Sequence, residues 1–167
     1  MKIAILTDEF PPHHSGGGAV IPFELAREFV QRGHSVLVIT TSEQVEPTVT
    51  SQYEGIEVFS IRRTLSHPRW IAWRCLYNRT MAAYIKSALA KFEPDVVNAH
   101  NVHTHLSYFS LRVARVYSRA VLLTAHDAML YHYGKHDDFL HKSNTKEPYR
   151  VTAWDILRVY RLRYNPF

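Results

Sequence analysis

Residues 2–41 read KIAILTDEFPPHHSGGGAVIPFELAREFVQRGHSVLVITT, and this stretch predicts the architecture of the chain. Residues 2–7 are a short apolar run, which is typical of a buried parallel strand. A loop rich in proline and glycine follows, and apolar residues then recur at helical spacing from about residue 19 to residue 32. Gly33 ends that helix, and residues 35–41 form a second apolar strand. Together these segments predict a right-handed βαβ unit.

The rest of the chain continues this alternation. Polar residues 43–53 predict a loop, and the histidine-rich residues 126–149 predict a long ordered loop. We expect further strands at 56–61, 96–99 and 120–125, the last of them buried, and helices at 68–92, 104–118 and 153–163. Strands that alternate with helices predict an α/β fold: a Rossmann-like, doubly wound and mostly parallel sheet with helices on both faces.

Two of these helices carry an apolar stripe whose members predict the inward face. In the helix at 68–92 the stripe comprises Trp70, Trp73, Tyr77, Met81, Tyr84 and Ala88. In the helix at 104–118 it comprises Leu106, Phe109, Val113 and Val116. Each stripe is expected to pack against the sheet.

The composition is that of one globular domain. The chain has 167 residues, 46% of them hydrophobic, and at this length a core forms without disulfides or metal. Its single cysteine, Cys75, cannot pair within the chain and is expected to be buried and inert. We expect no signal peptide and no membrane span, because no apolar run is long enough for either. These features favour a cytoplasmic protein.

The net charge of +5 is concentrated in two segments that are also rich in aromatic residues, 62–79 and 150–163. Basic and aromatic surfaces suit phosphorylated substrates, anionic lipid headgroups or nucleic acid. The alternative is a solvated basic face over buried aromatic side chains. Charge alone does not decide between these interpretations.

In a doubly wound sheet, ligands bind outside the carboxyl ends of the strands. This rule selects residues 8–18, 100–105 and 126–131, which each follow a strand and are expected to face one crevice. Gly16, Gly17 and Gly18 lead directly into a helix, where free backbone N–H groups suit a phosphate. The alternative is a loop that needs glycine only for its turns. The stretch is neither G-x-G-x-x-G nor a Walker A loop.

Histidine supplies the second signal, with eleven residues in the chain. The residues that could be imagined as a zinc site are His100, His103, His105, His126 and Asp127. Their spacing matches no metallohydrolase signature, so we expect no metal. His126 directly follows a predicted strand, where an imidazole can hydrogen-bond a hydroxylated substrate. The alternative for His126 is a histidine satisfied by the backbone.

The opening stretch resembles that of retaining GT-B glycosyltransferases of family 4. Further matching segments occur in the same order along the chain: GIEVFSI (55–61), PDVVNAHN (94–101), LLTAHDAML (122–130) and RLRYNPF (161–167). Each motif is weak alone, but the ordered set spans nearly the whole chain and is specific.

The resemblance implies roles for individual residues. Gly16, Gly17 and Gly18 would face the donor diphosphate, and His126 would act as the catalytic residue beside the donor sugar. The resemblance assigns five residues to the acceptor side: His14, His100, Asn101, His103 and Asp127. It implies no essential metal or other cofactor, because the nucleotide sugar is a substrate.

The resemblance also implies a second domain that grips the nucleotide. Residues 1–167 are therefore expected to be a single N-terminal, acceptor-side domain, truncated and inactive alone, with the C-terminal nucleotide-sugar-binding domain absent. Its expected partners are that domain, a nucleotide-sugar donor and an acceptor, which is a glycan, a lipid-linked sugar or a small molecule. Peripheral contact with the inner face of a membrane is a further expectation, and nucleic acid is not expected as a partner.

Two other functions remain open from the sequence. One is a zinc-dependent hydrolase or deacetylase that uses the histidine cluster. The other is a non-catalytic module that binds a nucleotide or a sugar phosphate.

Overall fold

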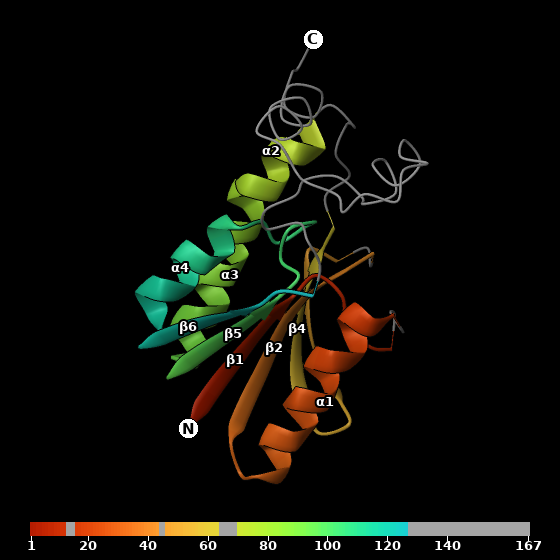
Figure 1. Ribbon diagram of the computed structural model, residues 1–167, viewed down its shortest axis with the longest axis vertical. Helices are drawn as coiled ribbons and strands as arrows, with labels where there is room; N and C mark the ends of the chain where they lie inside the picture. The colour runs from red at the N-terminus through yellow and green to blue at the C-terminus, as the bar shows by residue number, and fades with distance from the viewer. Residues whose placement is uncertain (13–15, 44–45, 64–69, 127–167) are drawn as a thin grey trace, which may run out of the picture.

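The computed structural model describes residues 1–12, 16–43, 46–63 and 70–126. A six-stranded sheet is covered by helices on both faces (Figure 1). The strands are β1 (Lys2–Thr7), β2 (Ser35–Ser42), β3 (Thr48–Tyr53), β4 (Ile56–Arg62), β5 (Val96–His100) and β6 (Ala120–Thr124). The helices are α1 (Gly17–Gln31), α2 (Ile71–Leu76), α3 (Arg79–Phe92) and α4 (Phe109–Tyr117).

The strand order is β3-β4-β2-β1-β5-β6. Only β3 is antiparallel to its neighbour, and all other adjacent strands are parallel. The chain winds outward from β1 in both directions, to β2 on one side and to β5 on the other. This is the predicted Rossmann-like, doubly wound sheet, and its strand order reverses between β1 and β5. Ligands of such folds bind at that point, outside the carboxyl ends of the strands.

Alternation along β1 divides the core into two layers. Ala4 and Leu6 face the layer that contains Met81 and Ile85 of α3, whereas Ile5 packs in the layer with α1. Figure 1 shows α1 on one face of the sheet and α3 and α4 on the other. Because both faces of the central strands are covered, β1 and β2 are buried at every position after the first, and the apolar runs within them are why the sequence predicted them correctly.

The prediction of a loop at 43–53 is partly wrong, because β3 lies within this range. Glu54 and Gly55 have φ values of 48° and 80° and connect β3 to β4 as a two-residue hairpin. Positive φ at both central residues is the requirement of the turn type that best matches strand twist. The strand is polar because it lies at the edge of the sheet, where half of its residues are exposed and none is buried.

The helical segment at 68–92 is two helices within its described part, and its apolar stripe is interrupted where they meet. Asn78 begins α3 by accepting a hydrogen bond from Met81 N, while its Nδ2 donates to the carbonyl of His105. The stripe is buried at Met81 and Ala88 and half-buried at Tyr84. Its earlier members are exposed, with Trp70 at 52%, Trp73 at 47% and Tyr77 at 52%. The prediction that these three aromatic residues are buried is therefore wrong, whereas Cys75 is buried as predicted.

Two expectations near the end of the described region are also wrong. The strand at 120–125 was predicted to be buried, but β6 is the last strand of the described sheet and Leu122 is 56% exposed. The helix α4 begins at Phe109, and its buried positions include Ser110 and Ala114, whereas Val116 is 76% exposed. The expectations for 127–149 and 153–163 lie outside the described residues. No helix in the described ranges is long and apolar enough to cross a membrane.

Candidate functional site

The register of the parallel strands brings three predicted segments to one edge of the sheet. Thr7, His100 and Thr124 are paired across β1, β5 and β6. Asp8 follows the first of these strands, Asn101 follows the second, and His126 lies just beyond the third. The carboxyl edge of the sheet therefore brings together the described starts of all three segments.

Asp8 anchors this edge, and the sequence analysis did not identify it. Its carboxylate is buried and accepts hydrogen bonds from the backbone N–H groups of Thr104 (2.6 Å), His105 (3.0 Å) and Leu106 (2.8 Å). The hydroxyl of Thr41 donates to the Asp8 carbonyl. One side chain at the end of β1 thus fixes the loop between β5 and α4. In the sequence, the one indication of this role is a carboxylate directly after an apolar strand. Its hydrogen-bond partners are backbone groups, which cannot be identified from the sequence.

Burial also changes the proton affinity of this carboxyl group. Desolvation raises the pKa of Asp8 from 3.8 to about 6, although the three backbone amides and the Arg63 guanidinium favour the charged form. A carboxylate that faces three N–H donors is suited to holding a loop. We therefore regard Asp8 as a positioning residue for the crevice.

Gly18 lies close to the side chain of Asn101, which follows β5. A Cβ atom at Gly18 would lie 3.2 Å from Nδ2 of Asn101 and 3.9 Å from a carboxylate oxygen of Glu9. Together with Asp8, His103 and Thr104, these three residues line a cleft. Gly16 and Gly17 lie in open space, where an added Cβ would meet nothing within 4 Å. Of the three glycines, only Gly18 is thus restricted by its neighbours.

His100 and His126 form a hydrogen-bonded pair. Nδ1 of His100 lies 2.8 Å from Nε2 of His126, and the two ring planes differ by 21°. Burial, and then the nearby His126, lower the pKa of His100 from 6.5 to about 4. The resemblance placed His100 on the acceptor side, but its side chain has no exposed surface. In this arrangement His100 can act on a ligand only through the half-buried His126.

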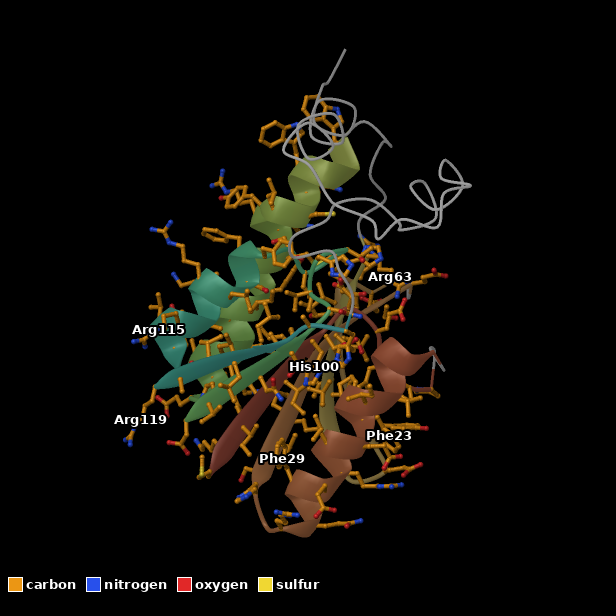
Figure 2. The ribbon with its side chains drawn as sticks, in the orientation of Figure 1. Phe23, Phe29, Arg63, His100, Arg115 and Arg119 are labelled. Carbon is orange, nitrogen blue, oxygen red and sulfur yellow. The ribbon has the colours of Figure 1, made fainter. Side chains whose placement is uncertain are left out.

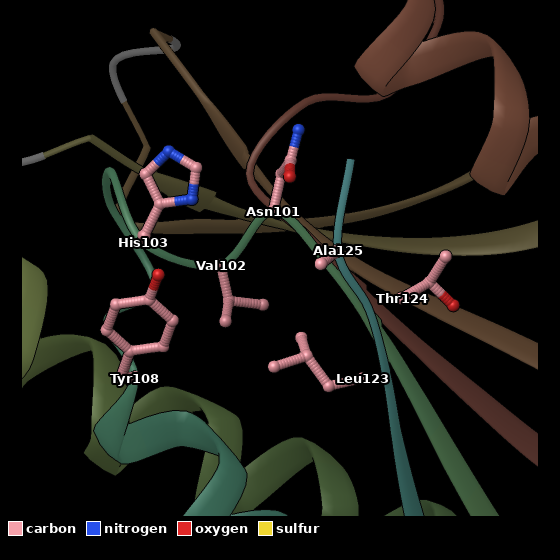
Figure 3. Close-up of a pocket in the computed structure, with 7 residues that line it drawn as sticks. All are labelled: Asn101, Val102, His103, Tyr108, Leu123, Thr124 and Ala125. Carbon is pink, nitrogen blue, oxygen red and sulfur yellow. The ribbon is translucent and has the colours of Figure 1, made fainter. Parts of the chain in front are cut away.

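His103 lies on a second, smaller depression beside the first. Figure 3 shows His103 and Tyr108 on one side of it and Leu123 of β6 on the other. The two rings are tilted by 30° with centroids 6.2 Å apart. Asn101 and His103 line both hollows, so the loop after β5 connects them.

The remaining predicted site residues, His14 and Asp127, lie outside the described residues. Within the described ranges, no group of three or more histidine, cysteine or acidic residues is placed to hold a metal ion. The site residues named from the sequence therefore stay predictions, of which the structure brings Gly18, Asn101, His103, His100 and His126 to the same edge.

Comparison with known proteins identifies similar sequences. The family model Glycosyltransferase Family 4 matches residues 15–162. A curated relative described as an uncharacterized glycosyltransferase of Methanocaldococcus jannaschii is 33% identical over 108 residues, which cover 63% of this chain and 26% of the relative. An uncharacterized 42.6 kDa protein in the cps region of Klebsiella pneumoniae is 26% identical over 144 residues, covering 79% of this chain and 38% of that protein. The matches thus span well under half of the curated relatives' own length.

Two solved structures share features of the fold. The catalytic domain of starch synthase IV from Arabidopsis thaliana, bound to ADP and acarbose, gives a TM-score of 0.44 at 17% identity, over 75% of this chain and 34% of that one. Sucrose-phosphate synthase from Thermosynechococcus elongatus gives a TM-score of 0.48 at 13% identity, over 98% and 97% of the two chains. At these values neither likeness carries an argument about function.

Proposed function

Because this chain belongs to glycosyltransferase family 4, we propose that it forms the acceptor-side domain of a retaining enzyme that transfers a sugar from a nucleotide-sugar donor to a hydroxyl acceptor. One observation carries the proposal. His100 and Asn101, consecutive residues at the end of β5, lie against His126 and Gly18 respectively. The residue proposed to approach the donor sugar and the glycine proposed to face the diphosphate thus contact two adjacent residues of the chain.

The proposed roles follow from what each group can do chemically. In the first turn of α1 the N–H of Ala19 donates to the Gly16 carbonyl. The N–H groups of Gly17 and Gly18 have no partner within the helix, and the helix dipole favours negative charge, so the start of α1 suits a diphosphate. Gly18 leaves room for the loop after β5 to approach. Asn101 and His103 line the same cleft and can hydrogen-bond acceptor hydroxyl groups. The catalytic role is assigned to His126.

A complete transferase needs more than these groups. Sugar transfer requires the developing charge on the leaving diphosphate to be stabilised while the acceptor hydroxyl is held in line. Since the matches span only 26% and 38% of the curated relatives, we propose that a further domain supplies the other wall of the crevice. The 167-residue chain alone is then expected to show no turnover of a nucleotide sugar.

The cleft beside Gly18 offers a direct test. Gly18→Val in the protein that contains this chain would direct a branched side chain at Asn101. Because small displacements of bound groups cost large factors in rate, we expect kcat/KM for the nucleotide sugar to fall by roughly 10- to 100-fold. Steady-state kinetics with a panel of nucleotide sugars measures this, and circular dichroism checks that the variant is folded.

Gly17→Ala is the matched control, since it adds a Cβ in open space and keeps the backbone N–H. It should lose much less activity than Gly18→Val. A folded Gly18→Val protein with unchanged kinetics would show that substrate does not occupy this cleft, and the proposed function would lose its main support.

We also propose that the acceptor is presented at an anionic membrane surface. The support is a patch on and beside α2 that comprises Trp70, Trp73, Tyr77, Arg74 and Arg79. Its three aromatic side chains are about half exposed. Tryptophan and tyrosine favour the membrane–water interface, and nearby arginine side chains attract anionic headgroups.

Sedimentation with vesicles of phosphatidylglycerol and phosphatidylcholine tests this patch. Replacing Arg74 and Arg79 by glutamine should weaken binding about 30-fold, since each basic residue near such a surface contributes roughly 1 kcal/mol. Arg115→Gln with Arg119→Gln is the matched control. These two arginines lie at the opposite end of the helical layer from α2 (Figure 2). Equal binding by both double variants would refute the membrane contact.

A further inference from the structure

The contact between His100 and His126 has a geometry that fixes which nitrogens meet. The ring centroids are 5.1 Å apart, and the nitrogens Nδ1 and Nε2 are 2.8 Å apart. The difference, about 2.3 Å, is roughly the width of one imidazole ring, so the two nitrogens lie close to the line between the centroids. With planes only 21° apart, the rings meet edge to edge and nearly coplanar. This is the geometry of a linear hydrogen bond.

One proton must lie between the two nitrogens, and the burial of His100 indicates its donor. Nε2 of His100 is buried and has no hydrogen-bond partner among the residues that the structure describes. If His126 were the donor, the proton of a neutral His100 would be on this Nε2 and would form a buried N–H group without an acceptor. Orphaned buried N–H groups are the rarest kind of unsatisfied group. The alternative, with the proton on Nδ1 of His100, leaves only an unpaired lone pair at Nε2.

We propose that His100 is a positioning residue that donates from Nδ1 to His126 and thereby holds His126 in the tautomer with its own proton on Nδ1. The hydrogen bond and the tautomer do not depend on the proposed function, and only their role in sugar transfer rests on it. The lowered pKa of His100, about 4, supports it, because His100 then stays neutral near pH 7 and has a single proton to place. At the carboxyl edge of the sheet, His126 would then carry an N–H donor, not a lone pair, at its second ring nitrogen.

This tautomer restricts what His126 can bind. An N–H donor at Nδ1 pairs with a ligand oxygen, such as a sugar hydroxyl or a phosphate oxygen, and cannot accept a proton while His126 is neutral. His126 would therefore orient or stabilise an oxygen of the substrate and would not act as a general base. Among the described residues, the hydrogen bond given for the His126 ring is the one that Nε2 makes with His100.

Nitrogen-15 NMR of the imidazole groups in the 167-residue chain tests the tautomer directly. We expect His126 to show a protonated Nδ1 and an unprotonated Nε2 near pH 7. His100→Leu removes the donor at similar volume, and His126 should then shift toward the Nε2–H form that predominates for a free histidine side chain. His100→Asn places an amide N–H near the position of Nδ1 and should keep the Nδ1–H form. A wild-type His126 protonated on Nε2 would overturn the proposal, even if both variants fail to fold.

Kinetics of the protein that contains this chain separate this inference from the proposed function. His100→Leu should lower kcat by about tenfold with little change in KM, and His100→Asn should restore most of it. The proposal fails if His100→Leu leaves the NMR signature of His126 unchanged. A changed signature with unchanged kinetics supports the hydrogen bond and instead overturns the role of His126 in transfer.

Discussion

Replacing Asp8 by alanine is expected to lower the free energy of unfolding by about 3 to 5 kcal/mol. The substitution removes a buried carboxylate that accepts hydrogen bonds from three consecutive backbone amides, Thr104 to Leu106. These N–H groups lie 96 to 98 residues away in the chain, so the contact holds two distant segments together. Urea denaturation followed by circular dichroism at neutral pH measures the loss.

Two further variants sharpen this prediction. In Asp8→Asn, Oδ1 can still accept from His105 and Leu106, but an amide N–H₂ would face the N–H of Thr104. We therefore expect an intermediate loss of stability. Glu9→Ala removes the neighbouring exposed carboxylate and should change stability by less than about 0.5 kcal/mol. Equal stabilities for Asp8→Ala and Glu9→Ala would show that the buried carboxylate does not hold the loop.

The pH dependence of stability is expected to reveal two buried groups whose contributions to the free energy of unfolding change in opposite directions with pH. The pKa of His100 is about 4 in the folded state and 6.5 when unfolded, so the unfolded chain binds the proton first and stability falls as pH drops from 6.5 to 4. The pKa of Asp8 is about 6 when folded and 3.8 when unfolded, so the folded chain binds the proton first and stability falls as pH rises from 3.8 to 6. Each effect amounts to about 3 kcal/mol.

Single substitutions separate the two contributions. Because the effects have opposite signs over nearly the same range, the wild-type free energy of unfolding should vary little between pH 4 and pH 6. In His100→Leu the Asp8 contribution remains, and stability should decrease as pH rises. In Asp8→Asn the His100 contribution remains, and stability should increase with pH. Urea midpoints across this range measure both slopes, and slopes of the same sign in the two variants would contradict the assignment.

The sequence predicted the parallel part of the fold because burial on both faces makes a strand apolar throughout. Residues 3–6 and 36–39 satisfy that condition at the centre of the sheet, whereas 96–99 alternate between buried and half-buried positions. By contrast, β3 is polar because it is an edge strand, and its alternating pattern in TVTSQY was too weak to predict it. The break at Asn78 was missed because a capping asparagine within a long apolar pattern resembles an ordinary polar position.

The part of the candidate site that could be predicted from the sequence is the set of residues that directly follow the predicted strands. The rule that ligands bind at the carboxyl ends of strands brought Gly18, Asn101 and His126 to one edge. It gave no indication that His100 would be buried behind His126, because that depends on the register between β5 and β6. Nor did it indicate the role of Asp8, whose partners are backbone groups that any sequence possesses.

The junction between β5 and the loop that follows it carries two contacts at once. His100 is the last residue of β5 and meets His126, whereas Asn101 is the next residue, has a φ of 42° and meets Gly18. An insertion or deletion at this junction would therefore disturb both contacts together, so a change in either one cannot be made by altering the length of the chain here.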